Sequence, residues 1–180
     1  MKKQSENRTA ASSDPNQGRT LRIIVETPRA CRNKYKYEQK TGRLKLSKVM
    51  PEGMVFPYEF GFIPGTLAQD GDPLDVLVLT DEPTFPGCEL DCRVLGVIKA
   101  EQTQDGKQSR NDRLIAVAVQ SLIYGQVEEL SDLDETVLRQ IEAFFVNYQK
   151  VRNIDFKILA REGVNSAMEM VERAQSRRAA

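Results

Sequence analysis

The strongest constraint on the fold is the spacing of the apolar residues, which form short runs separated by turn residues over the first two thirds of the chain. Short runs bounded by Gly, Pro, Asn and Asp are typical of β-strands. We expect strands over residues 21–26, 44–49, 74–80, 90–100 and 114–120, with a hairpin turn at residues 40–42. Many short strands with little helix between them predict a small barrel.

The last third of the chain changes to a helical period. Apolar side chains recur at helical spacing from Val137 to Tyr148, and Ser131 is the expected N-cap of this amphipathic helix. A strand over residues 154–159 follows. Gly163 then interrupts the chain before a second helix, which we expect Asn165 to cap and which ends near residue 177. The first helix is expected to lie on the barrel.

Chain length and charge limit the number of domains and the kinds of partner. The 180 residues suit one domain, and the polar residues 1–19 predict a disordered tail before a folded domain over residues 20–180. Lys plus Arg and Asp plus Glu both number 26, so no net charge favours nucleic acid or an anionic membrane. The absence of a signal peptide and of a long apolar span, with three cysteines that form no CxxC pair, predicts a cytoplasmic protein.

The segment with the most chemical content is Asp70-Gly71-Asp72-Pro73-Leu74-Asp75, which directly precedes the apolar residues 76–79. Three carboxylates on one short loop repel one another unless they take up protons, turn into water or bind multivalent cations. Gly71 supplies an unrestricted backbone and Pro73 fixes φ, so the loop can hold its carboxylates convergent. Oxygen ligands favour Mg²⁺, Mn²⁺ or Ca²⁺. The loop is a candidate metal site, although the same residue types also form ordinary polar turns.

Further candidate groups lie at strand ends and beside the first hairpin. Asp112 directly precedes an apolar strand, as Asp75 does, and is a candidate to complete the metal set. Glu26, at the end of the first expected strand, is a candidate outer-sphere metal group. The candidate phosphate-binding cations are Lys34, Lys36 and Lys48. The chain contains no histidine, so carboxylates, lysine, tyrosine and metal-bound water must carry any acid–base chemistry.

The acidic loop also carries a resemblance to a known family. From Asp70 to Val76 it matches, at every position, the signature of the soluble family I inorganic pyrophosphatases. Other segments of residues 21–160 agree with the family in the same order: Glu26-Thr27-Pro28, Asn33-Lys34-Tyr35, residues 53–57, residues 60–63, Pro86-Gly87, residues 96–99, and Phe144-Phe145 followed by Tyr148. One short motif could match by chance, but a collinear set is far more specific.

The resemblance implies a fold, a reaction and roles for several residues. The implied fold is a mainly β, α+β protein with two helices packed on a five-stranded, OB-like closed barrel. The implied reaction is Mg²⁺-dependent hydrolysis of pyrophosphate to two orthophosphates by a metal-activated water, in a homo-oligomer. The implied metal ligands are Asp70, Asp75 and a carboxylate of the later loop, for which Asp112 is our choice, and Asp72 accepts a proton from the water. The implied phosphate-binding residues are Lys34, Lys48 and Tyr148.

The chain departs from the family pattern around this site. Lys36 stands where the family typically has an acidic residue, and Lys48 stands where it has an arginine. The other departures are Phe56 and Phe60 for two tyrosines, Gln149 for a lysine, and Asn111 opposite the usual third metal-binding aspartate. Two alternatives therefore stay open, namely a hydrolase of another phosphoanhydride and a catalytically weakened phosphate- or metal-binding relative. The three retained aspartates favour the pyrophosphatase.

Overall fold

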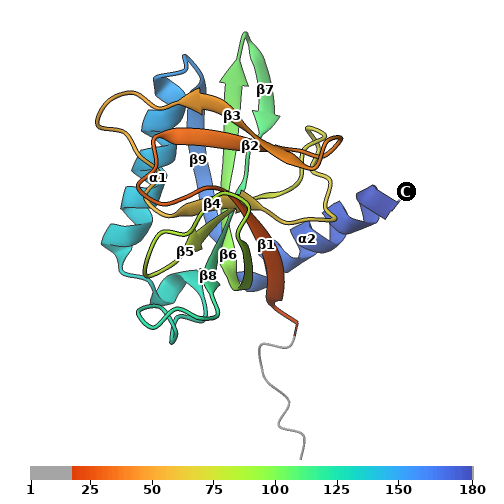
Figure 1. Ribbon diagram of the computed structural model, residues 1–180, viewed down its shortest axis with the longest axis vertical. Coiled ribbons are helices and arrows are strands. Elements are labelled where there is room, and N and C mark those ends of the chain that lie inside the picture. The colour runs from red at the N-terminus through yellow and green to blue at the C-terminus, as the bar shows by residue number, and fades with distance from the viewer. Residues whose placement is uncertain (1–17, 180) are drawn as a thin grey trace, which may run out of the picture.

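Five strands form a ring that closes on itself (Figure 1). In ring order they are β1 (Thr20–Thr27), β4 (Glu59–Phe62), β5 (Asp75–Leu79), β8 (Arg113–Ala118) and β6 (Glu89–Gln104), and β6 pairs back with β1. Only β5 and β8 pair in parallel among these five. The ring confirms the expected five-stranded barrel. The computed structural model describes residues 18–179, so residues 1–17 of the expected tail lie outside the described residues.

Strand β6 is long enough to belong to the ring and to a second layer. Up to Ile98 it pairs with β1 and β8, and its second half pairs with β7 (Lys107–Arg110) and β9 (Asp155–Glu162). The register with β8 shifts at Gly96, where a Cβ atom would lie 2.5 Å from the Glu162 carbonyl oxygen. A glycine is therefore required at this bend, and beyond it β6 extends out of the ring.

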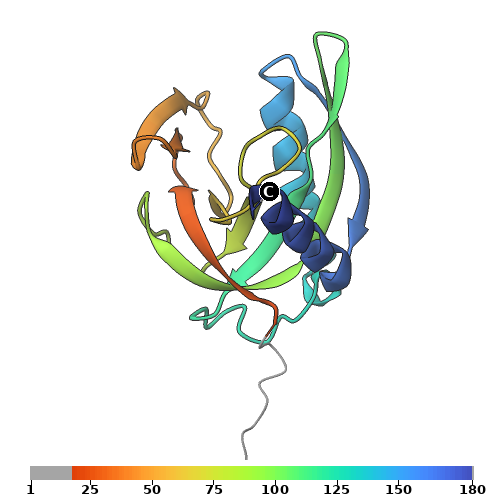
Figure 2. The same cartoon turned by 90° about the vertical axis from the view of Figure 1, so that its right-hand side faces the viewer.

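A separate two-stranded sheet, β2 (Asn33–Glu38) with β3 (Arg43–Val49), packs against the ring. The Tyr37 amide donates to the Glu26 carboxylate at 2.6 Å, and the Tyr35 amide donates to the Thr27 hydroxyl at 3.2 Å. The Tyr37 ring stacks on Phe62 with 5.2 Å between ring centroids. Figure 2 shows this hairpin on the opposite side of the molecule from α1, β9 and the outer part of β6.

Two helices cover the strands, as expected. They are α1 (Glu135–Lys150) and α2 (Val164–Ala179). Successive residues of β5 face opposite ways, since Leu77 joins the apolar cluster that contains Phe145 of α1, whereas Val76 joins the cluster that contains Val171 of α2. Because side chains alternate along β5, one of its faces shares an apolar cluster with α1 and the other shares a cluster with α2. No helix within residues 18–179 is long and apolar enough to cross a membrane.

Two helix caps differ from the sequence-based expectation. Ser131 lies in a single 3₁₀ turn, η1 (Leu130–Asp132), and α1 begins after Asp134, whose carboxylate accepts from the Thr136 amide at 2.7 Å. The backbone becomes extended at Leu133, which separates the two helical segments. The expected cap at Asn165 was also wrong because α2 already begins at Val164.

Candidate active site

The acidic loop between β4 and β5 is folded by its own backbone. The Ala68 amide donates to the Asp72 carbonyl at 2.7 Å, and the Asp72 amide donates to the Asp70 carboxylate at 3.1 Å. Gly71 adopts φ 88°, a left-handed conformation that glycine reaches without strain. The turn residues therefore hold Asp70 and Asp72 on one loop whose last acidic residue, Asp75, begins β5.

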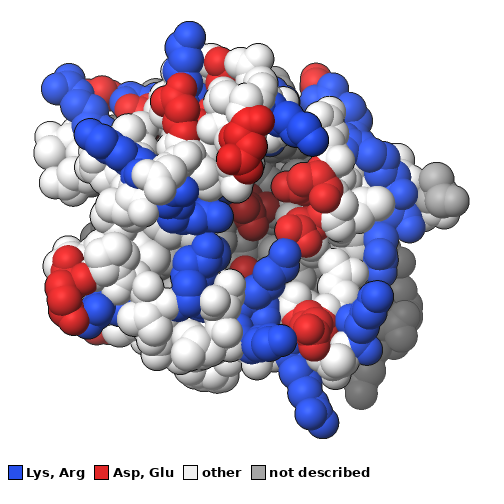
Figure 3. Space-filling view, turned by 90° about the horizontal axis from the view of Figure 1, so that it is seen from above, with Lys and Arg blue, Asp and Glu red and all other residues white. Residues whose placement is uncertain are grey.

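A cleft of about 280 Å³ brings this loop together with several other parts of the chain. Its other lining residues come from β1, the β2–β3 hairpin, β4, the outer part of β6, the start of β8 and the C-terminal end of α1. Seven of the eight predicted site residues line it, and Asp112 does not. In Figure 3 acidic side chains lie within a hollow that basic side chains border. The charged residues of the cleft are Glu26, Asp70, Asp72, Asp75, Lys34, Lys36, Lys48, Arg113 and Arg152.

Asp75 is held by an arginine that the sequence analysis did not single out. Val76 pairs with Leu114 in the parallel pair β5–β8, so the preceding residues, Asp75 and Arg113, lie side by side. The Arg113 Nη1 atom is 2.7 Å from Asp75 Oδ2, and the Arg113 side chain is only 10% exposed. Burial leaves this pair less screened by water and salt than a surface pair. Arg113 therefore places a fixed positive charge beside the acidic loop.

Asp72 forms a second ion pair, with Lys36 of β2. The Lys36 Nζ atom lies 3.0 Å and 2.8 Å from the two carboxylate oxygens of Asp72. This hydrogen bond to Asp72 is the main reason that the pKa of Lys36 is raised. The sequence could not show which way Lys36 points, and the structure directs it into the cleft.

Burial shifts the pKa of the two charged groups deepest in the cleft. Lys34 is half-buried, and its ammonium lies over the rings of Phe56 and Phe60, 4.1 Å from the Phe60 centroid. Loss of hydration lowers the pKa of Lys34 to about 8, although the nearby Asp75 and Glu26 carboxylates oppose the shift. Burial likewise raises the pKa of Glu26, partly offset by the hydrogen bond from Tyr37. Burial in the cleft therefore disfavours the charged forms of both Lys34 and Glu26.

Two buried hydrogen-bond donors in the cleft lack partners among the described residues. They are the hydroxyl of Tyr148 and the Nε–H of Arg113. Tyr148 stacks on Phe144 with 5.9 Å between centroids, and burial raises the pKa of its hydroxyl. Lys48 also lines the cleft, and its pKa is lowered by burial and by the charge of Arg152. Because buried polar groups are almost always hydrogen-bonded, the two unpartnered donors indicate a ligand with acceptor oxygens.

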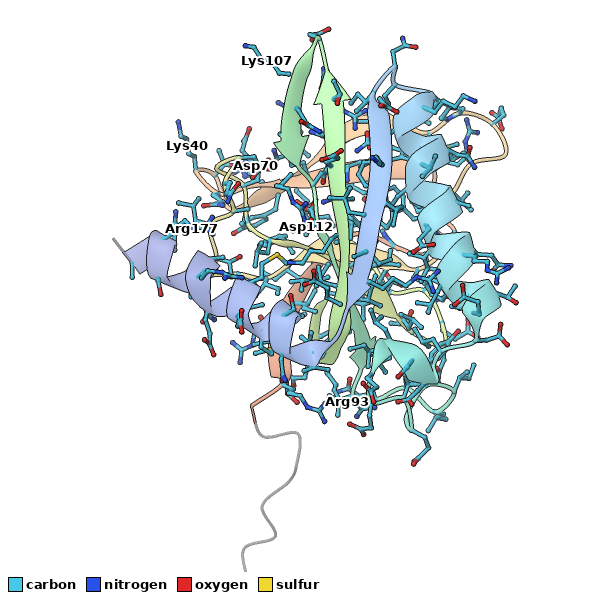
Figure 4. All side chains as sticks on the ribbon, turned by 180° about the vertical axis from the view of Figure 1, so that it is seen from behind. Lys40, Asp70, Arg93, Lys107, Asp112 and Arg177 are labelled. Carbon is cyan, nitrogen blue, oxygen red and sulfur yellow. The ribbon has the colours of Figure 1, made fainter. Side chains whose placement is uncertain are left out.

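Asp112 faces a different cavity, of about 380 Å³, on the other side of the acidic loop. Its carboxylate accepts from the Ala100 amide at 2.9 Å and from Arg110 at 2.7 Å. Asp70, Asp112 and Arg177, labelled in Figure 4, all line this second cavity. Side chains alternate along an extended chain, so Asp112 and its neighbour Arg113 point to different sides. These contacts connect Asp112 to β6 and to β7.

Neutral amides occupy the wall of the cleft next to α1. Asn111 donates to the side-chain oxygen of Gln102, and the Gln149 amide lies 3.5 Å from the same oxygen. The Arg152 guanidinium in turn donates to Gln149 at 2.7 Å. This network supplies no carboxylate, so the anionic oxygens of the cleft all come from Glu26 and the acidic loop.

The donor set of the cleft fits an oxygen-preferring divalent cation. Four carboxylates line it without an imidazole or a thiol, and within residues 18–179 Asp70 forms no ion pair. No three acidic or thiol groups of the described part of the chain lie close enough together to form a ready metal cage. Asp70 and Asp75 both line the cleft, and Asp75 is already paired with Arg113. A cation there would keep several water ligands, as Mg²⁺ usually does in proteins.

Several cleft residues were missed by the sequence analysis or were named without a known direction. Lys36 was a candidate phosphate-binding cation whose direction the sequence could not show. Asn111 and Gln149 were seen only as departures, and Gln102 gave no signal because it lies in a polar segment. Arg113 could have been found, since a basic residue opens an apolar strand just as Asp75 does. The missing information was that β5 and β8 are parallel neighbours, which places these two residues side by side.

Comparison with known proteins agrees with this geometry. A family model described as inorganic pyrophosphatase matches residues 23–179. The inorganic pyrophosphatase of Methanosarcina acetivorans is 34% identical over 155 residues, covering 86% of this chain and 90% of the relative. That of Halalkalibacterium halodurans is 35% identical over 159 residues, covering 88% and 95%.

Solved structures of inorganic pyrophosphatases superpose on this chain over most of its length. The crystal structure of inorganic pyrophosphatase from Thermus thermophilus superposes with a TM-score of 0.84 at 29% identity, covering 93% of this chain and 95% of that one. The structure of an inorganic pyrophosphatase from Coxiella burnetii gives 0.81 at 34% identity, covering 89% and 95%. With the acidic loop, the closed ring and a family match over most of its length, the chain belongs to the inorganic pyrophosphatase family.

Proposed function

We propose that the protein hydrolyses inorganic pyrophosphate to two orthophosphates in the cleft beside the acidic loop. The observation that carries this proposal is the convergence of Asp70, Asp72 and Asp75 with Lys34 and other cationic groups on one cleft. Family membership supports the same reaction. The oxygen of a water molecule attacks one phosphorus atom, the bridging P–O bond breaks, and the second phosphate leaves with that bridging oxygen.

Each side chain has a defined task in this proposal. Asp72 accepts the proton that the attacking water gives up. The charge of the phosphates is neutralised by Lys34, Lys48 and Arg113, and the Tyr148 hydroxyl donates to a phosphate oxygen. The rings of Phe56 and Phe60 exclude water around Lys34, which strengthens these electrostatic contacts.

The divalent ion, for which we propose Mg²⁺, would be held by Asp70 and Asp75, with Glu26 nearby as an outer group. Such an ion polarises the phosphate and lowers the pKa of water that it binds. We leave Asp112 outside the proposed metal set because its carboxylate is turned away from the cleft and contacts Arg110.

Replacement of Asp72 tests the assignment. Asp72→Asn keeps the size of the side chain but removes the proton acceptor, so we expect kcat to fall by about 10²–10⁴-fold. The matched control is Asp91→Asn, an exposed carboxylate near the opposite end of β6 that should leave kcat unchanged. Orthophosphate release from pyrophosphate with Mg²⁺ is the measurement. Equal kcat for Asp72→Asn and the wild type would remove Asp72 from the mechanism.

One observation favours a second candidate function, a phosphate-binding relative with weak turnover. Both Asp72 and Asp75 are already paired with cations, and one wall of the cleft carries neutral amides. A panel of pyrophosphate, triphosphate and nucleoside triphosphates with Mg²⁺ separates the possibilities. We expect pyrophosphate to give the highest kcat/KM. Binding of all three without orthophosphate release would favour the weakened relative.

We also propose that the protein forms a homo-oligomer and functions in the cytoplasm. Large apolar side chains remain exposed on one loop, with Leu122 92% and Ile123 69% exposed. Exposed apolar groups of this kind often mark contacts between chains. Sedimentation of the purified protein tests the oligomer, since a sedimenting mass equal to one chain would contradict it. Cell fractionation tests the location.

A further inference from the structure

The ion pair between Lys36 and Asp72 differs in kind from the one between Arg113 and Asp75. The Lys36 and Asp72 side chains are 55% and 54% exposed, whereas Arg113 is 10% exposed. Arg113 is also wedged over the rings of Phe60 and Phe145. An exposed pair on a flexible lysine contributes little to stability and exchanges partners readily. Of the two cations paired with the acidic loop, Arg113 is therefore fixed and Lys36 is mobile.

The mobile cation blocks the group to which we assign the proton transfer. The Lys36 ammonium is within 3.0 Å of both carboxylate oxygens of Asp72. While Lys36 stays there, its ammonium occupies the side of the Asp72 carboxylate that both oxygens share. The carboxylate becomes free for another partner when Lys36 moves to a second anion.

A second anion has suitable partners in the same cleft. Lys34, Lys48 and Arg152 line it and form no ion pair among residues 18–179. The Tyr148 hydroxyl and the Arg113 Nε–H are buried donors without partners in the described part of the chain. A phosphate group entering the cleft would meet three unpaired cations and two unsatisfied donors, and it would lie within reach of Lys36, which lines the same cleft.

We propose that Lys36 is an exchangeable counter-cation, which neutralises Asp72 until pyrophosphate enters and then turns to a phosphate oxygen, leaving the Asp72 carboxylate without a cation partner. This inference rests on the proposed function. It has two consequences for binding. The cleft takes up the pyrophosphate group without a divalent ion, because its own cations neutralise the charge. Lys36 also competes with divalent cations for the acidic loop.

Calorimetry on Lys36→Gln tests both consequences. The first titration uses imidodiphosphate, a pyrophosphate analogue with a bridging nitrogen, in buffer freed of divalent ions by a chelating resin. We expect wild-type protein to bind it and the variant to bind about five- to tenfold more weakly, as for the loss of one charged hydrogen bond. The second titration uses Mg²⁺ alone, for which we expect the variant to bind about two- to fivefold more tightly.

Two further variants control this experiment. Lys45→Gln removes the same charge from the residue paired with Lys36 across the hairpin, outside the cleft lining, and should change neither titration. Lys36→Arg retains a positive charge and should keep most of the imidodiphosphate affinity. The changes of opposite sign in Lys36→Gln cannot come from misfolding, which would weaken both ligands.

The outcomes separate this inference from the proposed function. The inference is overturned if wild-type protein fails to bind imidodiphosphate without divalent ions, or if Lys36→Gln leaves both affinities unchanged. Neither titration depends on turnover. A protein that releases orthophosphate but shows no effect of Lys36→Gln would keep the proposed function and lose the inference. A protein that shows both affinity changes but no hydrolysis would keep the inference about Lys36 and lose the proposed function.

Discussion

At the scale of single residues, Lys34 lowers the stability of the folded protein and supplies a cation for phosphate binding in the cleft. Its ammonium is buried over two phenylalanine rings and is not directly ion-paired among the described residues, although Asp75 and Glu26 lie near. The pKa of Lys34 is lowered from 10.5 to about 8, so the folded protein holds the charged form less well than the unfolded chain does. This cost is fully present below pH 8 and disappears as the pH rises toward 10.5.

Lys34→Met should therefore stabilise the protein while harming its activity. Methionine keeps the apolar stem that packs on the rings and removes the buried charge. We expect the free energy of unfolding at pH 7 to rise by about 1–3 kcal/mol, and the gain to shrink toward pH 10. Urea unfolding at the two pH values measures this, with the exposed Lys45→Met as control. A less stable Lys34→Met protein at pH 7 would contradict the account.

At the scale of elements, the β2–β3 hairpin carries most of the cations of the cleft and is attached to the ring by few contacts. Lys34, Lys36 and Lys48 all belong to it. The stacking of Tyr37 on Phe62 and two backbone-to-side-chain hydrogen bonds hold it in place. The position of the hairpin therefore decides how well these lysines face the acidic loop.

Tyr37→Ala should loosen the hairpin without disrupting the ring. The backbone hydrogen bond to Glu26 is retained in this variant, but the stacked pair is lost, which costs about 0.5–1.5 kcal/mol beyond the lost buried area. We expect KM for pyrophosphate to rise several-fold and hairpin amides to exchange faster with deuterium, while Tyr37→Phe behaves as the wild type. Unchanged KM and exchange in Tyr37→Ala would show that the hairpin is held by other contacts.

At the scale of the whole molecule, local sequence patterns predicted more of the fold than of the contacts within the site. The apolar run of β5 and the helical period around Phe145 are local patterns, so these two elements could be predicted, whereas the short ring strand β4 was not among the expected strands. That Asp112 lines the second cavity and Arg113 lines the cleft could not be read from the local sequence, which does not show which side of the chain each residue faces. The contact of Lys36 with Asp72 joins segments that only the folded ring and hairpin bring together.

The central claim is that the protein hydrolyses pyrophosphate in the cleft beside the acidic loop. The most direct measurement is a time course of orthophosphate formed by the purified protein from a known amount of pyrophosphate with excess Mg²⁺, beside a reaction without protein. The account predicts complete conversion with two orthophosphates formed for each pyrophosphate consumed. Orthophosphate formation no faster than in the reaction without protein would contradict it.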